Sequence, residues 1–204
     1  MNNMNKKNHW ETVYETKTPE QVSWTQEVPK TSLDFIQSLE LKKTAKIIDV
    51  GGGDSNLVDH LLKAGFENIT VLDISEKALN KAKKRLGDKA EKVTWIVSDI
   101  TEFEPETTYD LWHDRAAFHF LTNAEHIEKY KQTIKNSVNG YLIIATFSEN
   151  GPLKCSGLEI TQYSEEELSS EFAEDFEKIS CLNEDHKTPF DTLQNFTFCS
   201  FKKR

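Results

Sequence analysis

Residues 45–55 read AKIIDVGGGDS, a short apolar run followed by three consecutive glycines, Gly51, Gly52 and Gly53. Glycine allows a sharp backbone turn and lets the chain approach a ligand with no Cβ in the way. A helix that begins near Ser55 would point its free backbone amides at the same place. The stretch therefore predicts a buried strand, a ligand-binding turn and a helix in succession.

Strand-like and helix-like segments alternate along the chain from residue 45 on. Apolar or β-branched runs predict strands, and apolar residues at helical spacing predict helices, one of them capped by Ser75. The predicted strands span 45–50, 69–72, 93–97, 109–112 and 141–147, and the predicted helices span 56–64, 75–86 and 125–138. This alternation predicts an α/β fold with an open, doubly wound, mostly parallel sheet.

The pattern changes after Gly151. A predicted helix at 165–172 precedes two strand-like runs, 176–181 and 196–201, with only a polar connector between them. We expect these two runs to pair as antiparallel strands at the end of the sheet.

Acidic residues stand at the ends of the first three predicted strands. Asp49 and Asp54 flank the glycines, Asp73 ends the second strand in VLDIS, and Asp99 follows the third in VSDIT. Ligands of open α/β sheets bind outside the carboxyl ends of the strands, where a carboxylate such as Asp73 can accept hydrogen bonds from ribose hydroxyls. Asp99 could accept from an adenine amino group, or it could cap a turn.

Two kinds of cofactor compete for the glycine turn. The dinucleotide fingerprint G-x-G-x-x-G, aligned on Gly51 and Gly53, would need a third glycine where Asn56 stands. Asp54 would also place an anion near a pyrophosphate, whereas an acidic surround suits a cofactor that carries an ammonium and a sulfonium group. These features favour S-adenosylmethionine (SAM) over NAD.

The ordered motifs DVGGGDS, LDIS, SDIT and YDLWHDR resemble those of class I (seven-β-strand) SAM-dependent methyltransferases. The resemblance implies a Rossmann-like fold of seven mostly parallel strands with an antiparallel C-terminal strand. It implies SAM as the cofactor and S-adenosylhomocysteine as its product. For the methionine part of SAM, the resemblance implies Asp49, Gly51 and Gly53. For the ribose and the adenine, it implies Asp73, Ile74, Asp99 and Ile100. Near the amino end of the cofactor, it implies His113, Asp114 and Arg115.

The first 44 residues do not alternate, and we expect them to form a helical lid segment packed on one methyltransferase domain, residues 45–204. Trp10, Tyr14 and Trp24 form a W-x-x-x-Y element followed by S-W. This element is similar to one in a small bacterial subgroup of the family and in eukaryotic relatives that methylate protein lysines. The similarity implies that the element covers the cofactor and that Trp24 contacts it; alternatively, the aromatic side chains only anchor the core.

The segment WHDRAAFHF, residues 112–120, follows the fourth strand, where the methyl acceptor has to bind. Methyl transfer is an in-line displacement, so alignment supplies much of the rate, and a base is needed only for a protonated nucleophile. His119 is the candidate base and Asp114 a second candidate catalytic group, although a packed helix histidine is the alternative for His119. No N-P-P-Y or D-P-P-Y follows this strand, which argues against methylation of nucleic-acid bases or protein glutamine.

Composition bounds the function further. The 204 residues carry 25 basic and 34 acidic side chains, which gives a formal net charge of −9. The basic run at 77–85 is typical of a solvated helix face. Nucleic acid is therefore a disfavoured partner. No apolar run is long enough for a membrane helix, and the first residues lack the apolar core of a signal peptide. Three cysteines without a CxxC pair argue against a disulfide framework and favour a cytoplasmic location.

Two late polar segments carry Cys155 and His186. These side chains could approach each other and bind a soft metalloid or activate a thiol acceptor, or they could belong to an ordinary loop and hairpin connector. Two ligands are too few for zinc, so no metal site is predicted.

The sequence therefore predicts a SAM-dependent methyltransferase that acts on a small molecule, with a thiol or other soft nucleophile among the candidate acceptors. A protein lysine methyltransferase is the first alternative, and a protein that binds SAM or its product without chemistry is the second. An NAD oxidoreductase is disfavoured by Asn56 and by the lack of a substrate domain.

Overall fold

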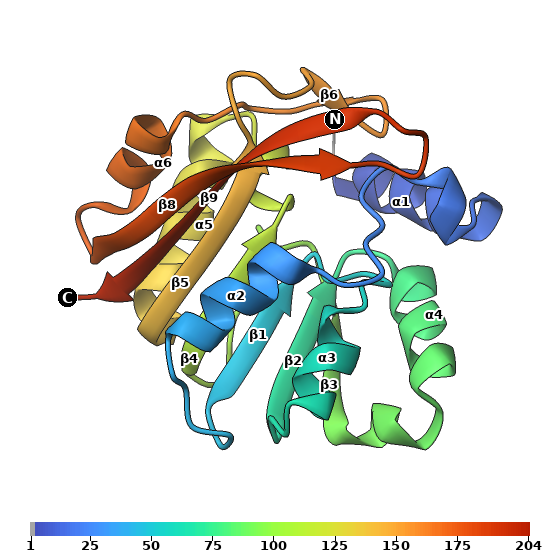
Figure 1. Ribbon diagram of the computed structural model, residues 1–204, viewed down its shortest axis with the longest axis horizontal. Coiled ribbons are helices and arrows are strands. Elements are labelled where there is room, and N and C mark those ends of the chain that lie inside the picture. The colour runs from blue at the N-terminus through green and yellow to red at the C-terminus, as the bar shows by residue number, and fades with distance from the viewer. Residues whose placement is uncertain (1–2) are drawn as a thin grey trace. The chain divides into compact units, whose positions relative to one another are not determined.

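The computed structural model describes residues 3–204, without the side chains of residues 3 and 4, so the first two residues of the predicted lid lie outside the described part. The chain forms two compact units that divide after Phe103. Seven strands form one sheet in the order β3-β2-β1-β4-β5-β9-β8 (Figure 1). The pairs β1–β2, β2–β3 and β4–β5 are parallel, and β9 is antiparallel to both β5 and β8. This confirms the predicted α/β fold with an antiparallel C-terminal strand.

The first unit contains the glycine turn and three parallel strands. Its elements are α1 (Asn3–Thr16), a 3-10 helix (Pro19–Gln21), α2 (Lys30–Ser38), β1 (Lys46–Val50), α3 (Leu57–Lys63), β2 (Asn68–Asp73), α4 (Glu76–Leu86), a 3-10 helix (Gly87–Lys92) and β3 (Val93–Val97). Strand β1 is buried from Ile47 to Val50, as its continuous apolar run predicts. The Ser75 hydroxyl accepts from the Ala78 N–H at 3.2 Å, so the predicted cap of α4 forms.

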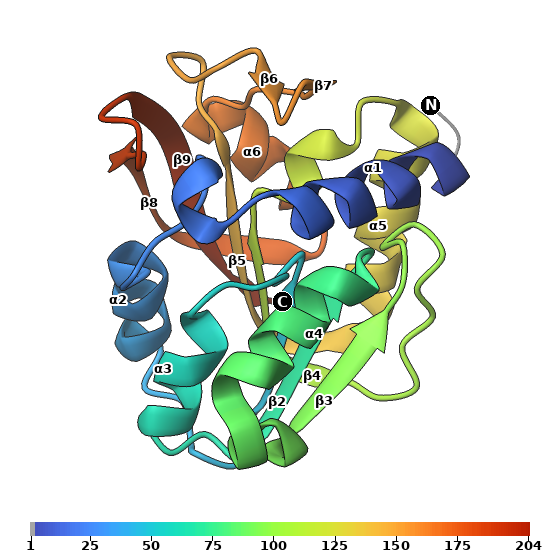
Figure 2. The same cartoon turned by 90° about the vertical axis from the view of Figure 1, so that its right-hand side faces the viewer.

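The second unit is built around the β5–β9–β8 part of the sheet. Its elements are β4 (Tyr109–Arg115), a 3-10 helix (Phe118–Phe120), α5 (Ala124–Ser137), β5 (Val138–Phe147), β6 (Lys154–Cys155), β7 (Leu158–Glu159), α6 (Glu165–Phe172), β8 (Phe176–Lys187) and β9 (Leu193–Lys203). Helix α6 begins with a capping box between Ser164 and Glu167, and its Phe172 packs against Phe201 of β9. Figure 2 shows the long β8–β9 hairpin curving beside α6.

The hairpin is longer than the sequence predicted. The polar connector expected between the strands is mostly strand, because β8 continues to Lys187 and β9 begins at Leu193. Polar residues can continue a strand at the edge of a sheet, where one face is exposed. The turn is closed by a bond of 2.8 Å from the Thr188 N–H to the Thr192 carbonyl.

The prediction against a disulfide was wrong. Cys181 and Cys199 form one, and they are directly opposite each other in the β8–β9 register. Cross-strand neighbours bring their Cβ atoms close together, whatever the total number of cysteines. Cys155 is the remaining thiol and is buried. The cytoplasmic location inferred from the cysteine count therefore loses that support.

No helix in residues 3–204 is both long and apolar enough to cross a membrane.

Candidate active site

The glycine turn follows β1 and is tied to β2. The N–H groups of Gly51 and Gly52 both donate to the Leu72 carbonyl, at 2.8 and 3.2 Å. Gly53 has φ +50°, in the left-handed region that favours glycine, and a Cβ added at Gly52 would lie 2.7 Å from the Asp49 carboxylate. The turn therefore requires glycine at Gly52 and Gly53 on steric grounds.

Three carboxylates converge on this turn. Asp73, at the end of β2, is buried, and its Oδ1 accepts from the Ser75 N–H at 2.8 Å. Burial, together with the charges of Asp54 and Asp49, raises the pKa of Asp73 to about 7, although hydrogen bonds from Ser75 and Gly53 oppose the rise. A crowded carboxylate of this kind is stabilised by a ligand that brings hydroxyl or cationic donors.

An arginine fixes the loop that continues from the turn. Arg85 of α4 donates to the backbone carbonyls of Asp54 and Ser55, at 2.7 and 2.8 Å, and forms an ion pair of 2.7 Å with Asp59 of α3. The sequence interpretation assigned this arginine to a solvated basic run and missed the role. No local signal could have revealed it, because the carbonyls that Arg85 binds lie 30 and 31 residues away.

The aromatic residues of the predicted lid come together over the turn. The ring centroids of Trp10 and Tyr14 lie 6.3 Å apart, and those of Trp24 lie 5.7 Å from Trp10 and 6.2 Å from Tyr14. A Cβ added at Gly53 would lie 2.6 Å from the Tyr14 hydroxyl oxygen. The W-x-x-x-Y and S-W elements thus form one aromatic cluster, Trp10–Tyr14–Trp24, beside the glycine turn.

Helix α1 is anchored to the start of α4, close to Asp73 in the sequence. The Glu11 carboxylate accepts from the N–H groups of Glu76 and Lys77, at 2.8 and 3.2 Å, and from the Ser75 hydroxyl at 3.0 Å. An acidic side chain satisfies the free amides of a helix N-terminus and suits its dipole. Figure 2 shows α1 lying across α4. The sequence analysis did not identify this contact.

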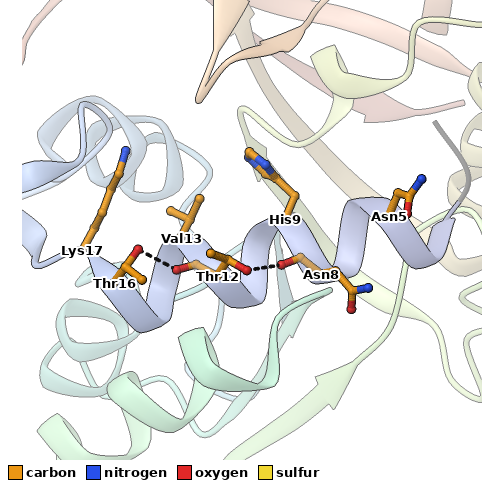
Figure 3. A pocket seen from close by; sticks show the side chains of 7 residues that line it. All are labelled: Asn5, Asn8, His9, Thr12, Val13, Thr16 and Lys17. Atoms are coloured by element: carbon orange, nitrogen blue, oxygen red, sulfur yellow. Dashed lines mark hydrogen bonds between the residues drawn. The ribbon is translucent and has the colours of Figure 1, made fainter.

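A shallow pocket runs along another face of α1, lined by Asn5, Asn8, His9, Thr12, Val13, Thr16 and Lys17. Figure 3 shows His9, Val13 and Lys17 pointing to the same side of the helix. The Thr12 and Thr16 hydroxyls donate to backbone carbonyls one turn earlier, each at 2.8 Å. The polar groups of this pocket are thus partly used within the helix, and the pocket alone does not define a ligand.

The remaining predicted cofactor residues of the first unit lie after β2 and β3. Asp99 caps a turn, because its Oδ1 accepts from the Thr101 N–H and hydroxyl, at 2.9 and 2.8 Å. Ile100 is buried and Ile74 is half-buried. The capping alternative for Asp99 is thus realised at one of its two carboxylate oxygens.

In the second unit, Asp114 belongs to a buried polar network. Its Oδ1 accepts from the N–H groups of Ala117 and Phe118, at 2.8 and 3.2 Å, and its Oδ2 accepts from the Tyr130 hydroxyl at 2.5 Å. Burial raises the pKa of Asp114 to about 6, against the opposing effect of these bonds. Both oxygens are occupied in holding the turn after β4, so the geometry favours a structural role over the expected catalytic or cofactor-binding one.

His113 and Arg115 flank Asp114 on β4, and their side chains alternate with it across the strand. His113 is buried in the sheet. The Arg115 guanidinium lies 4.7 Å above the ring of Phe196 on β9. The two residues therefore lie on the face of the sheet opposite to Asp114.

His119 is fully buried in the 3-10 helix after β4. Its Nδ1 accepts from the Phe147 N–H at 3.3 Å. Burial, and then the charge of Arg115, lower its pKa to about 3. The ring is therefore neutral and carries its proton on Nε2, an arrangement that makes it a hydrogen-bond donor and a poor base.

No contact found among the described residues supports the hypothetical pair of Cys155 and His186. Cys155 lies on β6, no hydrogen bond joins it to His186 in the part of the chain that the structure describes, and burial raises the pKa of its thiol to about 12. The His186 ring lies 6.2 Å from that of Phe196. Within residues 3–204, no group of three or more His, Cys, Asp or Glu side chains is arranged to hold a metal ion.

Known proteins share both the sequence of the glycine-turn region and the fold. Residues 47–139 match a family described as a methyltransferase domain. The malonyl-[acyl-carrier protein] O-methyltransferase of Anoxybacillus flavithermus is 34% identical over 109 residues, which are 50% of this chain and 39% of that protein. The N-terminal Xaa-Pro-Lys N-methyltransferase 1-B of Xenopus laevis is 30% identical over 101 residues, 48% of this chain and 45% of that protein.

A solved structure extends the likeness to the whole chain. The SAM-dependent methyltransferase of Anabaena variabilis has a TM-score of 0.77 at 15% sequence identity, covering 100% of this chain and 96% of that one. The matched stretches span less than half the length of the two curated relatives above. Residues 47–139 are thus similar to a methyltransferase domain, and the whole chain shares the fold of a solved SAM-dependent methyltransferase.

Proposed function

We propose that this protein binds SAM at the glycine turn and transfers its methyl group to a small-molecule acceptor. The observation that carries the proposal is the turn itself, where glycines that cannot be replaced without a clash lie beside the buried carboxylates Asp49 and Asp73. The ribose hydroxyls and the ammonium of SAM are donors, and these carboxylates are acceptors. The donor-rich ligand and the acceptor-rich turn thus fit each other.

In this proposal each residue of the first unit has a distinct role. Asp73 accepts hydrogen bonds from the ribose, with Ile74, Asp99 and Ile100 at the adenine. Asp49 and the backbone of Gly51 and Gly53 hold the methionine part, and Trp24 closes over it. SAM supplies an electrophilic methyl group on a sulfonium, and the residues of this chain bind, orient and exclude water.

Calorimetry with S-adenosylhomocysteine beside NAD tests this proposal. We expect S-adenosylhomocysteine to bind and NAD not to bind. Asp73→Asn should weaken S-adenosylhomocysteine at least about tenfold, because a hydrogen bond to a charged group is worth about 1.5–3 kcal/mol. Asp88→Asn, on the exposed 3-10 helix after α4, is the matched control and should change nothing. Binding of NAD alone would refute the proposal.

Methylation of a protein amine is a second candidate function. It is favoured by the likeness to an N-terminal N-methyltransferase and by the net charge of −9, which would attract a basic target. Incubation of cell lysate with methyl-labelled SAM separates the two candidates. Label in small molecules supports the first, and label on protein lysines or N-termini supports the second.

A further inference from the structure

Helix α1 depends on its neighbours to stay in place. It has 14 residues, and isolated helices shorter than about 12–15 residues are marginal in water. Within Asn3–Thr16, no acidic residue lies in the first turn and no basic residue lies in the last, so neither end of the helix dipole is compensated. Among its described side chains, those of residues 5–16, only Val13 and Tyr14 are buried. Polar contacts with α4 therefore matter for the position of this helix.

The main polar contact is made by the half-buried Glu11 at the N-terminus of α4. Its Oε1 accepts from the Glu76 N–H at 2.8 Å, and its Oε2 accepts from the Lys77 N–H at 3.2 Å and the Ser75 hydroxyl at 3.0 Å. The next amide, that of Ala78, is bonded to the Ser75 hydroxyl oxygen. The first three amides of α4 thus all have acceptors, and α1 supplies the acceptor for two of them.

Two further contacts between the helices lie at the surface. The ion pair of 2.7 Å between Lys77 and Glu15 joins side chains that are 44% and 62% exposed, so water screens it strongly. The Lys81 ammonium donates to the Lys17 carbonyl at 2.8 Å, also at an exposed position. Both contacts are weaker ties than the three bonds of Glu11, which therefore decide how readily α1 detaches.

The docked helix places an aromatic side chain at the glycine turn. Three residues after Glu11, Tyr14 has its hydroxyl oxygen 2.6 Å from the position that a Cβ would take on Gly53, and Asp73 Oδ2 lies 3.3 Å from the same position. Ser75, which donates its hydroxyl to Glu11, also donates its N–H to Asp73 at 2.8 Å. One residue thus connects the attachment of α1 to the carboxylate proposed to bind the ribose.

We propose that α1 is a gate over the glycine turn and that Glu11 is its latch, a positioning residue that lets go of α4 whenever a ligand enters or leaves. This inference rests on the proposed cofactor site. The latch is reversible, because the amides of Glu76 and Lys77 are bonded at an exposed position where water can replace the carboxylate.

A latch of this kind has a distinct kinetic signature. Both oxygens of the Glu11 carboxylate are used by Ser75 and α4, so they stabilise the docked position of α1 equally with and without a ligand at the turn. An interaction that is the same in two states does not shift the equilibrium between them. The contribution of Glu11 therefore cancels in the affinity for the ligand and appears in both the association and the dissociation rate.

Hydrogen exchange of the full chain without ligand tests the latch directly. Glu11→Ala should speed the exchange of the α1 amides about three- to thirtyfold, the factor that corresponds to the loss of a helix cap. Glu15→Ala is the matched control, because it makes the same change of charge on the same helix, and its α1 amides should stay within about twofold of the wild type. Equal exchange of α1 in the two variants, or an increase that extends to β1 and β2, would overturn the proposal.

Stopped-flow binding of S-adenosylhomocysteine, followed by tryptophan fluorescence, tests the gate. Glu11→Ala should raise the association and dissociation rate constants by a similar factor, again about three- to thirtyfold, while Kd stays within about threefold. Glu11→Gln keeps one acceptor oxygen without the charge and should be intermediate, and Glu15→Ala should match the wild type. A change in the dissociation rate alone would show that Glu11 acts on the bound ligand, and unchanged rates would show that α1 is no gate; either result would overturn the proposal.

The two measurements also separate this inference from the proposed function. If the wild type does not bind S-adenosylhomocysteine, the proposed cofactor site fails. The comparison of hydrogen exchange in Glu11→Ala and Glu15→Ala then still decides whether Glu11 holds α1 on α4.

Discussion

Removal of the Arg85 guanidinium should loosen the loop that follows the glycine turn. Arg85→Ala deletes hydrogen bonds to the backbone carbonyls of Asp54 and Ser55 and the ion pair with Asp59. The two carbonyls directly follow Gly53 in the sequence, so the lost contacts act on the part of the chain that has to be ordered for a ligand to bind. Helix α4 itself loses no buried apolar surface.

The magnitude follows from the exposure of these groups. The side chains of Arg85 and Asp59 are each 32% exposed, so screening by water limits their ion pair to about 0.5 kcal/mol. The two bonds to carbonyls contribute about 1 kcal/mol each at a partly exposed site. We therefore expect Arg85→Ala to lower the free energy of unfolding by about 2–3 kcal/mol, and to weaken S-adenosylhomocysteine about tenfold if half of this loss falls on the loop.

Urea unfolding and calorimetry measure the two effects. Lys84→Ala is the matched control, because it makes the same change of charge on the same helix at an exposed neighbour. Arg85→Lys should be intermediate, since an ammonium cannot reproduce the fork that reaches two carbonyls and a carboxylate. Equal affinity for S-adenosylhomocysteine in Arg85→Ala and Lys84→Ala would refute the assignment of Arg85 to the loop.

Three further predictions concern the turn, its carboxylate and the network after β4. Gly53→Ala should abolish binding of S-adenosylhomocysteine, because its Cβ would lie 2.6 Å from the Tyr14 hydroxyl at a φ of +50°; calorimetry should show partial recovery in the double variant with Tyr14→Phe, and no recovery would refute the contact. Burial raises the pKa of Asp73 in the folded protein to about 7 from an ordinary 3.8, so the folded protein binds the carboxyl proton of Asp73 more tightly than the unfolded chain does. The contribution of the protonated Asp73 to the free energy of unfolding should therefore decrease as the pH rises from about 4 to 7. In the proposed site the Asp73 carboxylate accepts from the ribose, so the affinity for S-adenosylhomocysteine should decrease as the pH is lowered below about 7. An Asp73→Asn variant with the same pH profile as the wild type would contradict this. Tyr130→Phe should lower the free energy of unfolding by about 2–4 kcal/mol in urea, because it leaves a buried oxygen of Asp114 without its bond, while the affinity for S-adenosylhomocysteine stays the same.

Much of the fold could be predicted from the sequence. The apolar run before Gly51 has to be a buried strand, and the alternation that follows it allows few arrangements other than a doubly wound sheet. The convergence of Asp49 and Asp73 was predictable for a related reason, because the carboxyl ends of neighbouring parallel strands share one edge of a sheet. The cross-strand disulfide was not, because the count of cysteines carries no information about register.

The roles of single polar side chains could not be predicted in this way. Asp114 stands where a catalytic acid was expected, yet its oxygens are taken by the turn and by Tyr130. The bond between Asp114 and Tyr130 depends on the position of α5, which carries Tyr130. The spacing of residues within the motif YDLWHDR contains no information about that position.

The sequence by itself determined which segments form strands and helices, through the spacing of their apolar residues. It also determined the glycine turn and the acidic residues at the strand ends, because these follow from local backbone geometry and from chain order. Only the tertiary structure decided that Arg85 holds the loop and that Glu11 caps α4, since each of these side chains meets partners far away along the chain. It also decided that His119 is a neutral donor, because the state of an imidazole depends on what buries it and on which nitrogen finds a partner.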